Sequence, residues 1–323
     1  MNNQKYIIGI DGGGTKTEVV VFNEKGETLI KYTGEATNLY IYKETAVKSI
    51  LSIIEKIIVD LKINYSDISA LGCSLAGVSD LNSRDLLLKE FDRLRIINKS
   101  IVLSDTESAY QLLCPTGQGI LISIGTGVVC LGRNSAGKSF KVAGKGYDKG
   151  DAGSGYWIGK EIIKKLFLNQ GILLVDNEMK QIYDCVRNIF DVDNLDLLEE
   201  LLHKQDNIVT KTAEIAKDII KYAQGGNDIA LSVIQEGTRN VAEYIVYLID
   251  EMNSNKDKVV FAGNGSIIKN NFYRKSLNDA LQFDVSGIHW IFSDIPCSYS
   301  SAIIAAQCNN IDISRNDIIE NIN

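Results

Sequence analysis

Short apolar runs alternate along this chain with stretches in which apolar residues recur at helical spacing, and each change of pattern predicts a new element. Short β-branched and aromatic runs between glycines and polar residues predict strands at 7–10, 19–22 and 27–32. From about residue 43 to 61 the apolar positions recur at helical spacing, which predicts an amphipathic helix. The chain is therefore expected to open with three short strands and a helix.

Strands and helices alternate after this opening. The pattern predicts a strand at 69–75, a helix at 81–91, a short strand at 101–103 and a helix at 106–113. Three hairpin-connected strands followed by alternating strands and helices are typical of a ribonuclease-H-like α/β unit.

The same order of elements then begins again. Predicted strands at 119–124, 128–132 and 140–143 form a second three-stranded opening, and a mainly helical stretch from about 176 to 252 follows. Further strands are expected at 259–262 and 289–292. The repeated order indicates an internal structural repeat.

Two domains are therefore expected, and Pro115 with Gly117 marks the boundary between them. The first is an N-terminal ribonuclease-H-like domain at 1–114. The second is a C-terminal ribonuclease-H-like domain at 115–323 with a helical insertion. A closing helix at 299–308 is rich in small residues, which suits it to pack back on the first domain.

The composition argues against several classes of protein. Hydrophobic residues make up 45% of the 323 residues and charged residues 23%, as in ordinary soluble globular proteins. The net charge of −7 argues against a partner such as nucleic acid or an anionic membrane. No apolar run approaches the roughly 18 residues of a membrane span. Because a strand begins within a few residues of the first methionine, we expect no signal peptide and a cytoplasmic location.

Cysteine and histidine give no sign of a metal or redox centre. The six cysteines are scattered singly, and the two histidines, His203 and His289, have no neighbouring ligand set. We expect reduced thiols, and neither zinc chemistry nor a histidine-based triad. A general base in this protein is therefore expected to be a carboxylate.

A dense cluster of glycines lies between the first two predicted strands. Asp11 ends the first strand, three glycines at 12–14 follow, and Thr15 and Lys16 add a hydroxyl and a cation. Glycines let backbone N–H groups approach a phosphate chain closely, and a carboxylate at the strand end suits Mg²⁺. The stretch predicts a phosphate loop with Asp11 as a metal ligand.

Two better-known phosphate loops do not match this stretch. A dinucleotide fingerprint requires a helix directly after the glycines, but β-branched and aromatic residues follow this turn. A Walker A loop needs Gly-Lys-Ser/Thr adjacent, and Gly14-Thr15-Lys16 breaks that adjacency. A tight glycine hairpin without a ligand stays open as an alternative.

A second glycine turn, Gly125-Thr126-Gly127, lies at the equivalent place in the second half of the chain. If the two halves face each other, the two turns oppose one another across a cleft and can hold one phosphate chain from both sides. Two such turns, each in the first hairpin of a repeated unit, are stronger evidence for a phosphate site than one.

Two aspartates are candidates for chemistry. Asp105 follows the strand at 101–103, and α/β sheets present reactive groups at the carboxyl ends of their strands. In phosphoryl transfer one carboxylate orients the attacking hydroxyl. Asp105 and Asp151 both precede predicted helices, so helix capping is the alternative role for each. Gly263-Asn264-Gly265 could admit a nucleoside or could form an ordinary strand-to-helix turn.

These motifs, taken in order, resemble one family. The stretch 10–17 resembles the first phosphate motif of the acetate-and-sugar-kinase, chaperone and actin superfamily. Within it the chain is most similar to the N-acetylglucosamine kinase family, which includes the BadF/BadG-type activator ATPases. The similarity continues through Gly34…Asn38, Ser74-Leu75-Ala76-Gly77, Ser104-Asp105, Gly125-Thr126-Gly127, Gly144-Lys145-Gly146 and the segment 150–157. It implies two actin-like ATPase domains with a nucleotide and sugar cleft between them.

The resemblance implies ATP and Mg²⁺ as cofactors and a role for each matching residue. Asp105 matches the catalytic base, which takes the proton of the sugar 6-hydroxyl. Positions matched to ATP or its phosphates are Asp11, Gly13, Gly14, Thr15, Lys16, Gly125, Thr126, Gly127, Gly263 and Asn264. Positions matched to the amino sugar are Asn38, Ser74, Ala76, Gly77, Asp105, Thr126, Gly144, Lys145 and Asp151. A homodimer is expected because relatives commonly form one.

Two departures from the family pattern bear on the substrate. Many relatives have Gly-Asp-Glu-Gly-Ser where this chain has Ala152 in place of the glutamate, and some carry tryptophan at the position of Lys145. The loss of an acid and the gain of a cation suit a substrate with a carboxylate, such as N-acetylmuramic acid.

We therefore expect an ATP-dependent kinase that phosphorylates the 6-hydroxyl of an amino sugar, N-acetylglucosamine or N-acetylmuramic acid. The alternatives are a glucosamine kinase, an activator ATPase of a partner enzyme with an iron–sulfur cluster, and a nucleotide-binding regulatory module.

Overall fold

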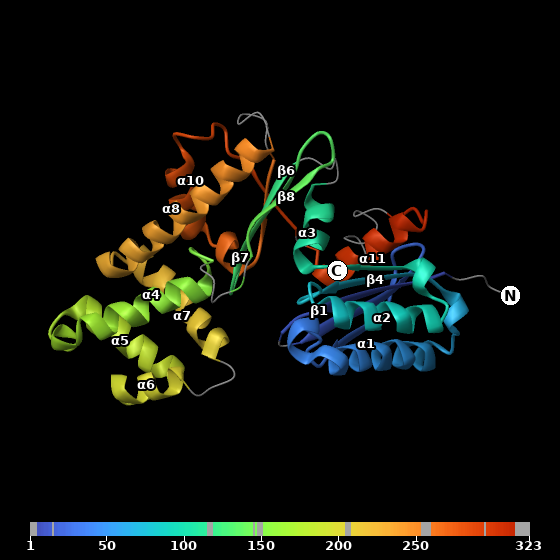
Figure 1. Ribbon diagram of the computed structural model, residues 1–323, viewed down its shortest axis with the longest axis horizontal. Helices are drawn as coiled ribbons and strands as arrows, with labels where there is room; N and C mark the ends of the chain where they lie inside the picture. Colours follow the sequence, from blue (N-terminus) through green and yellow to red (C-terminus); the bar gives the residue numbers. More distant parts are fainter. Residues whose placement is uncertain are drawn as a thin grey trace. The chain divides into compact units, whose positions relative to one another are not determined.

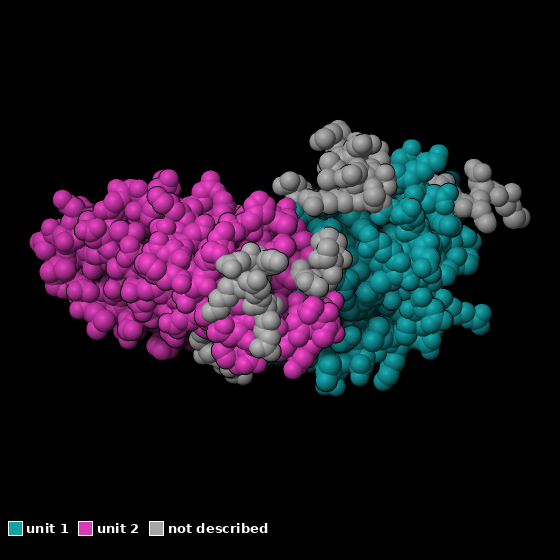
Figure 2. All heavy atoms as spheres, turned by 90° about the horizontal axis from the view of Figure 1, so that it is seen from above, with its two compact units in different colours: residues 1–112, 293–323 teal, residues 113–292 magenta. Residues whose placement is uncertain are grey.

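The computed structural model of the protein describes residues 5–14, 16–114, 119–144, 146, 151–203, 208–252, 260–293 and 295–313. The chain divides into two compact units, residues 1–112 with 293–323 and residues 113–292 (Figure 2). This division differs from the expected domains at the C-terminal end, because residues 293–323 belong to the first unit.

The first unit is built on a mixed sheet. Its strands are β1 (Tyr6–Gly12), β2 (Thr17–Asn23), β3 (Thr28–Gly34), β4 (Ile68–Leu75) and β5 (Ser100–Leu103), in the order β3-β2-β1-β4-β5. The pairs β1–β2 and β2–β3 are antiparallel, whereas β1–β4 and β4–β5 are parallel. The carboxyl ends of β1, β4 and β5 therefore lie at the same edge of the sheet.

Helices cover both faces of this sheet (Figure 1). One face is covered by α1 (Leu39–Leu61) and α2 (Leu81–Arg93) and the other by α11 (Cys297–Cys308), while α3 (Asp105–Leu113) follows β5 and short 3₁₀ turns lie at Tyr65–Asp67 and Ile97–Lys99. Ile8 and Ile10 pack with α1 and α2, and the alternate residue Ile7 packs with α11. The period-two alternation of a strand thus supplies two separate cores.

The first turn of α1 is the main departure from the expected boundaries of the elements. The helix begins at Leu39, four residues before the expected start, because the Asn38 side chain caps it by accepting from the N–H of Tyr40 and Ile41. Lys43 interrupts the helix with φ 46° and ψ −123°. Regular helical periodicity therefore starts only after Lys43, which is where the apolar pattern placed it.

The second unit repeats the sheet of the first. Its strands are β6 (Gly119–Ile124), β7 (Val128–Arg133), β8 (Ser139–Ala143), β9 (Phe261–Asn264) and β10 (Trp290–Phe292), in the order β10-β9-β6-β7-β8. When the strands are counted from the first strand of each unit, the strand order and strand directions of the second sheet match those of the first sheet. The predicted internal repeat and the two ribonuclease-H-like units are confirmed.

The helices of the second unit form its larger part. They are α4 (Gly155–Leu168), α5 (Asn177–Phe190), α6 (Leu195–Leu202), α7 (Ile208–Gln224), α8 (Asp228–Glu251), α9 (Ser266–Lys269) and α10 (Asn271–Leu281), with a 3₁₀ turn at Gln170–Ile172. Their apolar faces share one core with β6 and β7. None of the helices within the described ranges is long and apolar enough to cross a membrane.

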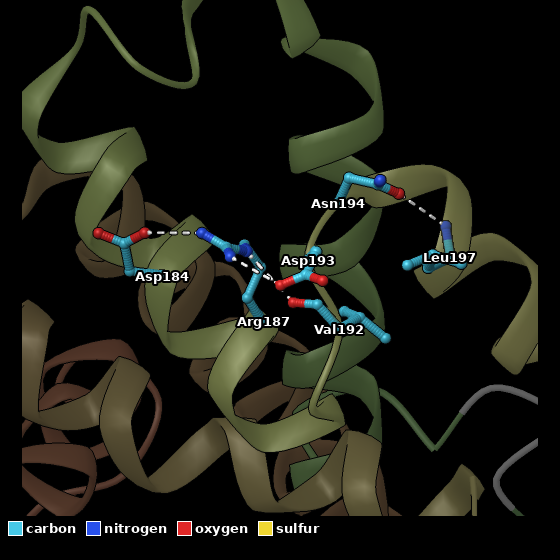
Figure 3. A network of polar contacts seen from close by, with 6 residues as sticks. All are labelled: Asp184, Arg187, Val192, Asp193, Asn194 and Leu197. Carbon is cyan, nitrogen blue, oxygen red and sulfur yellow. Dashed lines mark hydrogen bonds and ion pairs between the residues drawn. The ribbon is translucent and has the colours of Figure 1, made fainter.

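A polar network fixes the corner between α5 and α6 (Figure 3). The Arg187 guanidinium lies 3.7 Å from carboxylate oxygens of Asp184 and Asp193 and donates to the Val192 carbonyl at 3.2 Å. Asn194 caps α6 by accepting from the N–H of Leu197 at 2.9 Å. These contacts hold the end of α5, whose Ile189 lines the pocket described below.

Candidate active site

The parallel strands of the first unit bring three predicted site residues to one edge. Asp11 on β1 is in register with Ser74 on β4, and Ser74 is in register with Leu103 on β5. Asp105 follows two residues after Leu103, at the start of α3. The topology therefore gathers Asp11, Ser74 and Asp105 at the carboxyl edge, as expected for an α/β site.

Burial and charge change the ionisation of Asp11. Burial raises its pKa most, and the neighbouring carboxylates of Asp105 and Glu18 add to this, so that the pKa reaches about 6. The Ser74 hydroxyl and Lys16 act in the opposite direction. Ser74 Oγ is buried and makes no hydrogen bond of good geometry to a described atom. The carboxyl edge of this sheet thus holds the interacting carboxylates of Asp11 and Asp105, together with the buried Ser74 hydroxyl, which can form a further hydrogen bond.

Asp105 does not cap the helix that follows it. Ser104 Oγ accepts from the Glu107 N–H at 3.1 Å, and the Glu107 carboxylate accepts from the Ser104 N–H at 2.9 Å. This reciprocal pair is a capping box, so the expected alternative of Asp105 as the cap is wrong. The Asp105 side chain is exposed and accepts hydrogen bonds from Thr106, at 2.8 Å from the N–H and 3.3 Å from the hydroxyl.

The first glycine turn is held through its carbonyl groups. The Gly12 carbonyl accepts from the Ala76 N–H at 2.8 Å, and the Gly13 carbonyl accepts from the Thr37 N–H at 3.2 Å. Gly14 has open space where a side chain would stand. Lys16, predicted as a phosphate contact, forms an ion pair of 2.5 Å with Glu18, which raises its pKa. Thr15 lies outside the described residues.

The predicted sugar contacts of the first unit lie beside this turn. The Ala76 carbonyl accepts from the Leu39 N–H at 2.9 Å, and Asn38 uses its side-chain oxygen as the cap of α1. Gly77 has φ 75°, and a Cβ there would lie 2.3 Å from Asn38 Oδ1. Only glycine permits this approach, so Gly77 fixes the position of Asn38.

The second glycine turn is tied to the start of α4. The Gly125 carbonyl accepts from the Gly155 N–H at 2.8 Å, and the Thr126 carbonyl accepts from the Tyr156 N–H at 3.1 Å. A Cβ at Gly127 would lie 3.4 Å from the Asp151 carboxylate, so Asp151 stands against the turn.

Asp151 does not cap α4 either. The cap is Ser154, whose hydroxyl accepts from the Trp157 N–H at 3.2 Å, so the capping alternative for Asp151 is wrong. Asp151 is only 5% exposed, and its charge raises the pKa of the nearby Cys130 in addition to burial. Gly144 follows the end of β8 at the same sheet edge, with φ 67°. Lys145, the predicted cation of the substrate site, lies outside the described residues.

A pocket of about 680 Å³ opens beside the second glycine turn. Gly125 and Thr126 form one wall, and Ser266, Ile267 and Asn270 form another. The third wall is α7, which contributes Thr210, Ala213, Glu214, Ala216, Lys217, Asp218 and Ile220.

The sequence did not identify this wall. Gly263 and Asn264, predicted to contact the nucleoside, do not line the pocket. Gly263 packs against the Phe292 ring, and the Asn264 amide donates to Ser123 Oγ at 3.2 Å. The helical pattern of α7 gave no signal for the missed residues, because polar residues on an amphipathic helix usually face solvent.

The sequence matches the model of the BadF/BadG/BcrA/BcrD ATPase family over residues 8–306. The chain belongs to this family. The predicted family resemblance is therefore confirmed over nearly the whole chain.

Two relatives that are similar in sequence to this chain are kinases. An N-acetylmuramic acid/N-acetylglucosamine kinase of Clostridium acetobutylicum is 27% identical over 319 residues, which covers 94% of this chain and 100% of that protein. An N-acetyl-D-glucosamine kinase of Dictyostelium discoideum is 24% identical, over 79% of this chain and 83% of that protein.

The fold is also that of a solved structure. A protein of Porphyromonas gingivalis, provisionally assigned as an N-acetylglucosamine kinase, superposes with a TM-score of 0.69. The superposition covers 94% of this chain and 99% of that chain, at 19% sequence identity. The expected actin-like ATPase architecture is thereby confirmed for this member of the family.

Proposed function

We propose that the protein is an ATP-dependent kinase that transfers the γ-phosphoryl group of ATP to the 6-hydroxyl of an amino sugar. N-acetylglucosamine is the first candidate, and N-acetylmuramic acid is the second. The observation that carries this proposal is Asp105, an exposed carboxylate at the carboxyl edge of the sheet that is released from capping by Ser104 and Glu107. The two curated relatives named above act on these sugars, and a kinase of this class needs such a base.

The reaction assigns a role to each group. Asp105 accepts the proton of the 6-hydroxyl as the sugar oxygen bonds to the γ-phosphorus, and the bond from that phosphorus to the bridging oxygen of ADP breaks. The first glycine turn would approach the phosphate chain around Gly14, since the Gly13 N–H already donates to the Lys16 carbonyl at 3.0 Å, and the pocket bounded by α7 offers room for the nucleoside. Asn38 and Asp151 hold the sugar hydroxyl and amide groups.

The donor groups around Asp11 fit Mg²⁺. That ion binds one or two carboxylates and takes its other ligands from water and the substrate phosphates. Asp11 has a second carboxylate, Asp105, as an electrostatic neighbour, and the Ser74 hydroxyl is buried beside it. Within the described ranges no three His, Cys, Asp or Glu side chains are grouped to cage an ion. A bound cation would neutralise the charge of ATP and of this acidic edge together.

The pH dependence of stability tests the environment of Asp11. Its pKa is raised from 3.8 to about 6, so the folded protein favours the protonated form. This contribution is fully present below pH 3.8 and is lost as the pH rises through about 6. Without Mg²⁺ we expect Asp11→Asn to be more stable than the wild type at pH 7.5, but not at pH 4. Urea unfolding at both pH values measures the difference, and an equal difference at both would contradict this assignment.

The wall of the pocket formed by α7 gives a second test. Ala213→Leu adds three carbon atoms to a wall residue of the pocket, which overpacks the space left for a nucleoside. We expect the KM for ATP to rise about tenfold, whereas the KM for the sugar changes little. Ala136→Leu, on the exposed β7–β8 turn, is the matched control. A KM for ATP that stays within twofold of the wild type would contradict the nucleoside assignment.

The function itself is tested by ADP release with ATP and Mg²⁺ across a sugar panel. The panel contains N-acetylglucosamine, N-acetylmuramic acid, glucosamine, N-acetylmannosamine and glucose. We expect turnover on one or two amino sugars and a product phosphorylated at the 6-hydroxyl, identified by NMR. Turnover on N-acetylmuramic acid would agree with Lys145 and Ala152 as carboxylate-favouring departures. ATP hydrolysis that is independent of every sugar would overturn the proposal.

A further inference from the structure

The segment 37–43 contains the predicted sugar contact Asn38 and bonds to the first glycine turn. The Thr37 N–H donates to the Gly13 carbonyl at 3.2 Å. The Tyr42 hydroxyl donates to the Gly14 carbonyl at 3.1 Å. Two successive carbonyls of the turn are therefore held by this one short segment.

The orientation of these carbonyls matters for a phosphate site. A carbonyl oxygen facing a phosphate repels it, whereas a backbone N–H attracts it. The bonds to Thr37 and Tyr42 direct the Gly13 and Gly14 carbonyls toward the segment 37–43, so these oxygens are not free to turn toward a phosphate bound elsewhere on the turn. Among the described atoms outside its chain neighbours, none lies within 4 Å of the Cβ position of Gly14, so there is open space beside this residue. Within the described residues, the Tyr42 hydroxyl is the side-chain group that bonds to the Gly14 carbonyl.

The backbone at Lys43 is strained in a way that serves this contact. Lys43 has φ 46° and ψ −123°, a backbone conformation that residues other than glycine rarely adopt. This kink separates the turn 39–42 from the rest of α1 and leaves Tyr42 beside the phosphate loop. Tyr42 is 39% exposed, so its ring contributes little to a core. The strained backbone at Lys43 places the partly exposed Tyr42 against the Gly14 carbonyl. This arrangement indicates that Tyr42 positions the glycine turn.

The same segment carries Asn38. Its side-chain oxygen accepts from the N–H of Tyr40 and Ile41 at 3.0 and 3.1 Å, and its carbonyl accepts from the Tyr42 N–H at 2.9 Å. A ligand that orders Asn38 therefore also orders the turn that supports Gly14. The path from the sugar contact to the phosphate loop thus runs through the hydrogen bonds of the turn 38–42 and ends at the bond from Tyr42 to Gly14.

We propose that Tyr42 is a positioning residue, which holds the Gly14 carbonyl away from ATP and couples sugar binding at Asn38 to nucleotide affinity. The coupling part rests on the proposed function, whereas the effect on nucleotide binding alone does not. The role differs from catalysis, because Tyr42 acts through the Gly14 peptide and not on the reacting atoms.

The test is Tyr42→Phe, which removes one hydroxyl and keeps the ring. Calorimetric titration with ADP and Mg²⁺ is expected to give a Kd about three- to tenfold higher than for the wild type, the range for loss of one hydrogen bond. Addition of N-acetylglucosamine is expected to tighten ADP binding in the wild type and to do so less in the variant. Tyr247→Phe, a 57% exposed tyrosine on α8, is the matched control and should bind ADP as the wild type does.

Two measurements separate this role from a merely structural one. The thermal midpoint of Tyr42→Phe should stay within about 2 °C of the wild type, since a surface substitution changes stability little. Lys43→Gly relieves the strain but keeps the hydroxyl, so it should retain the wild-type Kd for ADP. An unchanged Kd for ADP in Tyr42→Phe would overturn the proposal. If no sugar on the panel is phosphorylated, the proposed function fails, but the effect on ADP binding still decides the role of Tyr42.

Discussion

Asp105→Asn is expected to abolish sugar phosphorylation while leaving the fold intact. A positioned general base contributes about 10²–10⁴-fold to a rate, so kcat should fall by at least two orders of magnitude. The side chain is exposed, and its contact with the Thr106 N–H uses an oxygen that asparagine also has. The KM for the sugar should change little, because the amide keeps the size and the hydrogen-bonding edge of the carboxylate. Steady-state kinetics on the sugar that turns over fastest measures both parameters.

Glu107→Gln is the control for this experiment. It makes the same change from carboxylate to amide on the same helix, two residues away, and glutamine can replace glutamate in a capping box. We expect Glu107→Gln to keep at least half of the wild-type kcat. If Asp105→Asn also kept it, another group would have to take the proton. If sugar-independent ATP hydrolysis persisted in both variants, the result would favour the alternative functions, an activator ATPase or a nucleotide-binding regulatory module.

The fold could be predicted because local patterns and topology agree in this chain. Short β-branched and aromatic runs placed the strands within a few residues, helical spacing placed α1, and α11 lies where the closing helix rich in small residues was expected. The repeat was visible because each unit opens with three strands around a glycine turn. The exception at the start of α1 has a local cause, since Asn38 and Lys43 build a turn that an apolar pattern does not record.

The site was predictable only where its residues lie at strand ends. Asp11, Ser74 and Asp105 meet at one edge because parallel strands bring their carboxyl ends together. The role of Asp105 could not be separated from capping until Ser104 and Glu107 were seen to form the cap. The pocket wall on α7 could not be predicted, because tertiary packing decides which face of an amphipathic helix borders a cavity.

Gly72→Ala is expected to destabilise the first unit by about 3 kcal/mol or more, as overpacking against an unyielding backbone does. Gly72 on β4 and its parallel neighbour Gly9 on β1 form a flat strip on which α11 lies. A Cβ at Gly72 would stand 1.9 Å from the Ser301 carbonyl oxygen, and one at Gly9 would stand 1.9 Å from that of Ser298. These obstacles are helix backbone, so relief requires α11 to move away from the sheet.

The measurement can separate the units, because both tryptophans, Trp157 and Trp290, belong to the second unit. In urea, the far-ultraviolet circular dichroism of Gly72→Ala should lose an early component, while the tryptophan fluorescence transition shifts less. Gly171→Ala, where an added Cβ meets nothing within 4 Å, should unfold like the wild type. Equal unfolding of Gly72→Ala and the wild type would mean that α11 is not seated on β1 and β4.

Because α11 also donates from Ser301 Oγ to the Ile10 carbonyl at 3.3 Å, its displacement would disturb the strand that carries Asp11. We therefore expect Gly72→Ala to lose ATP binding together with stability, whereas Asp105→Asn loses only turnover.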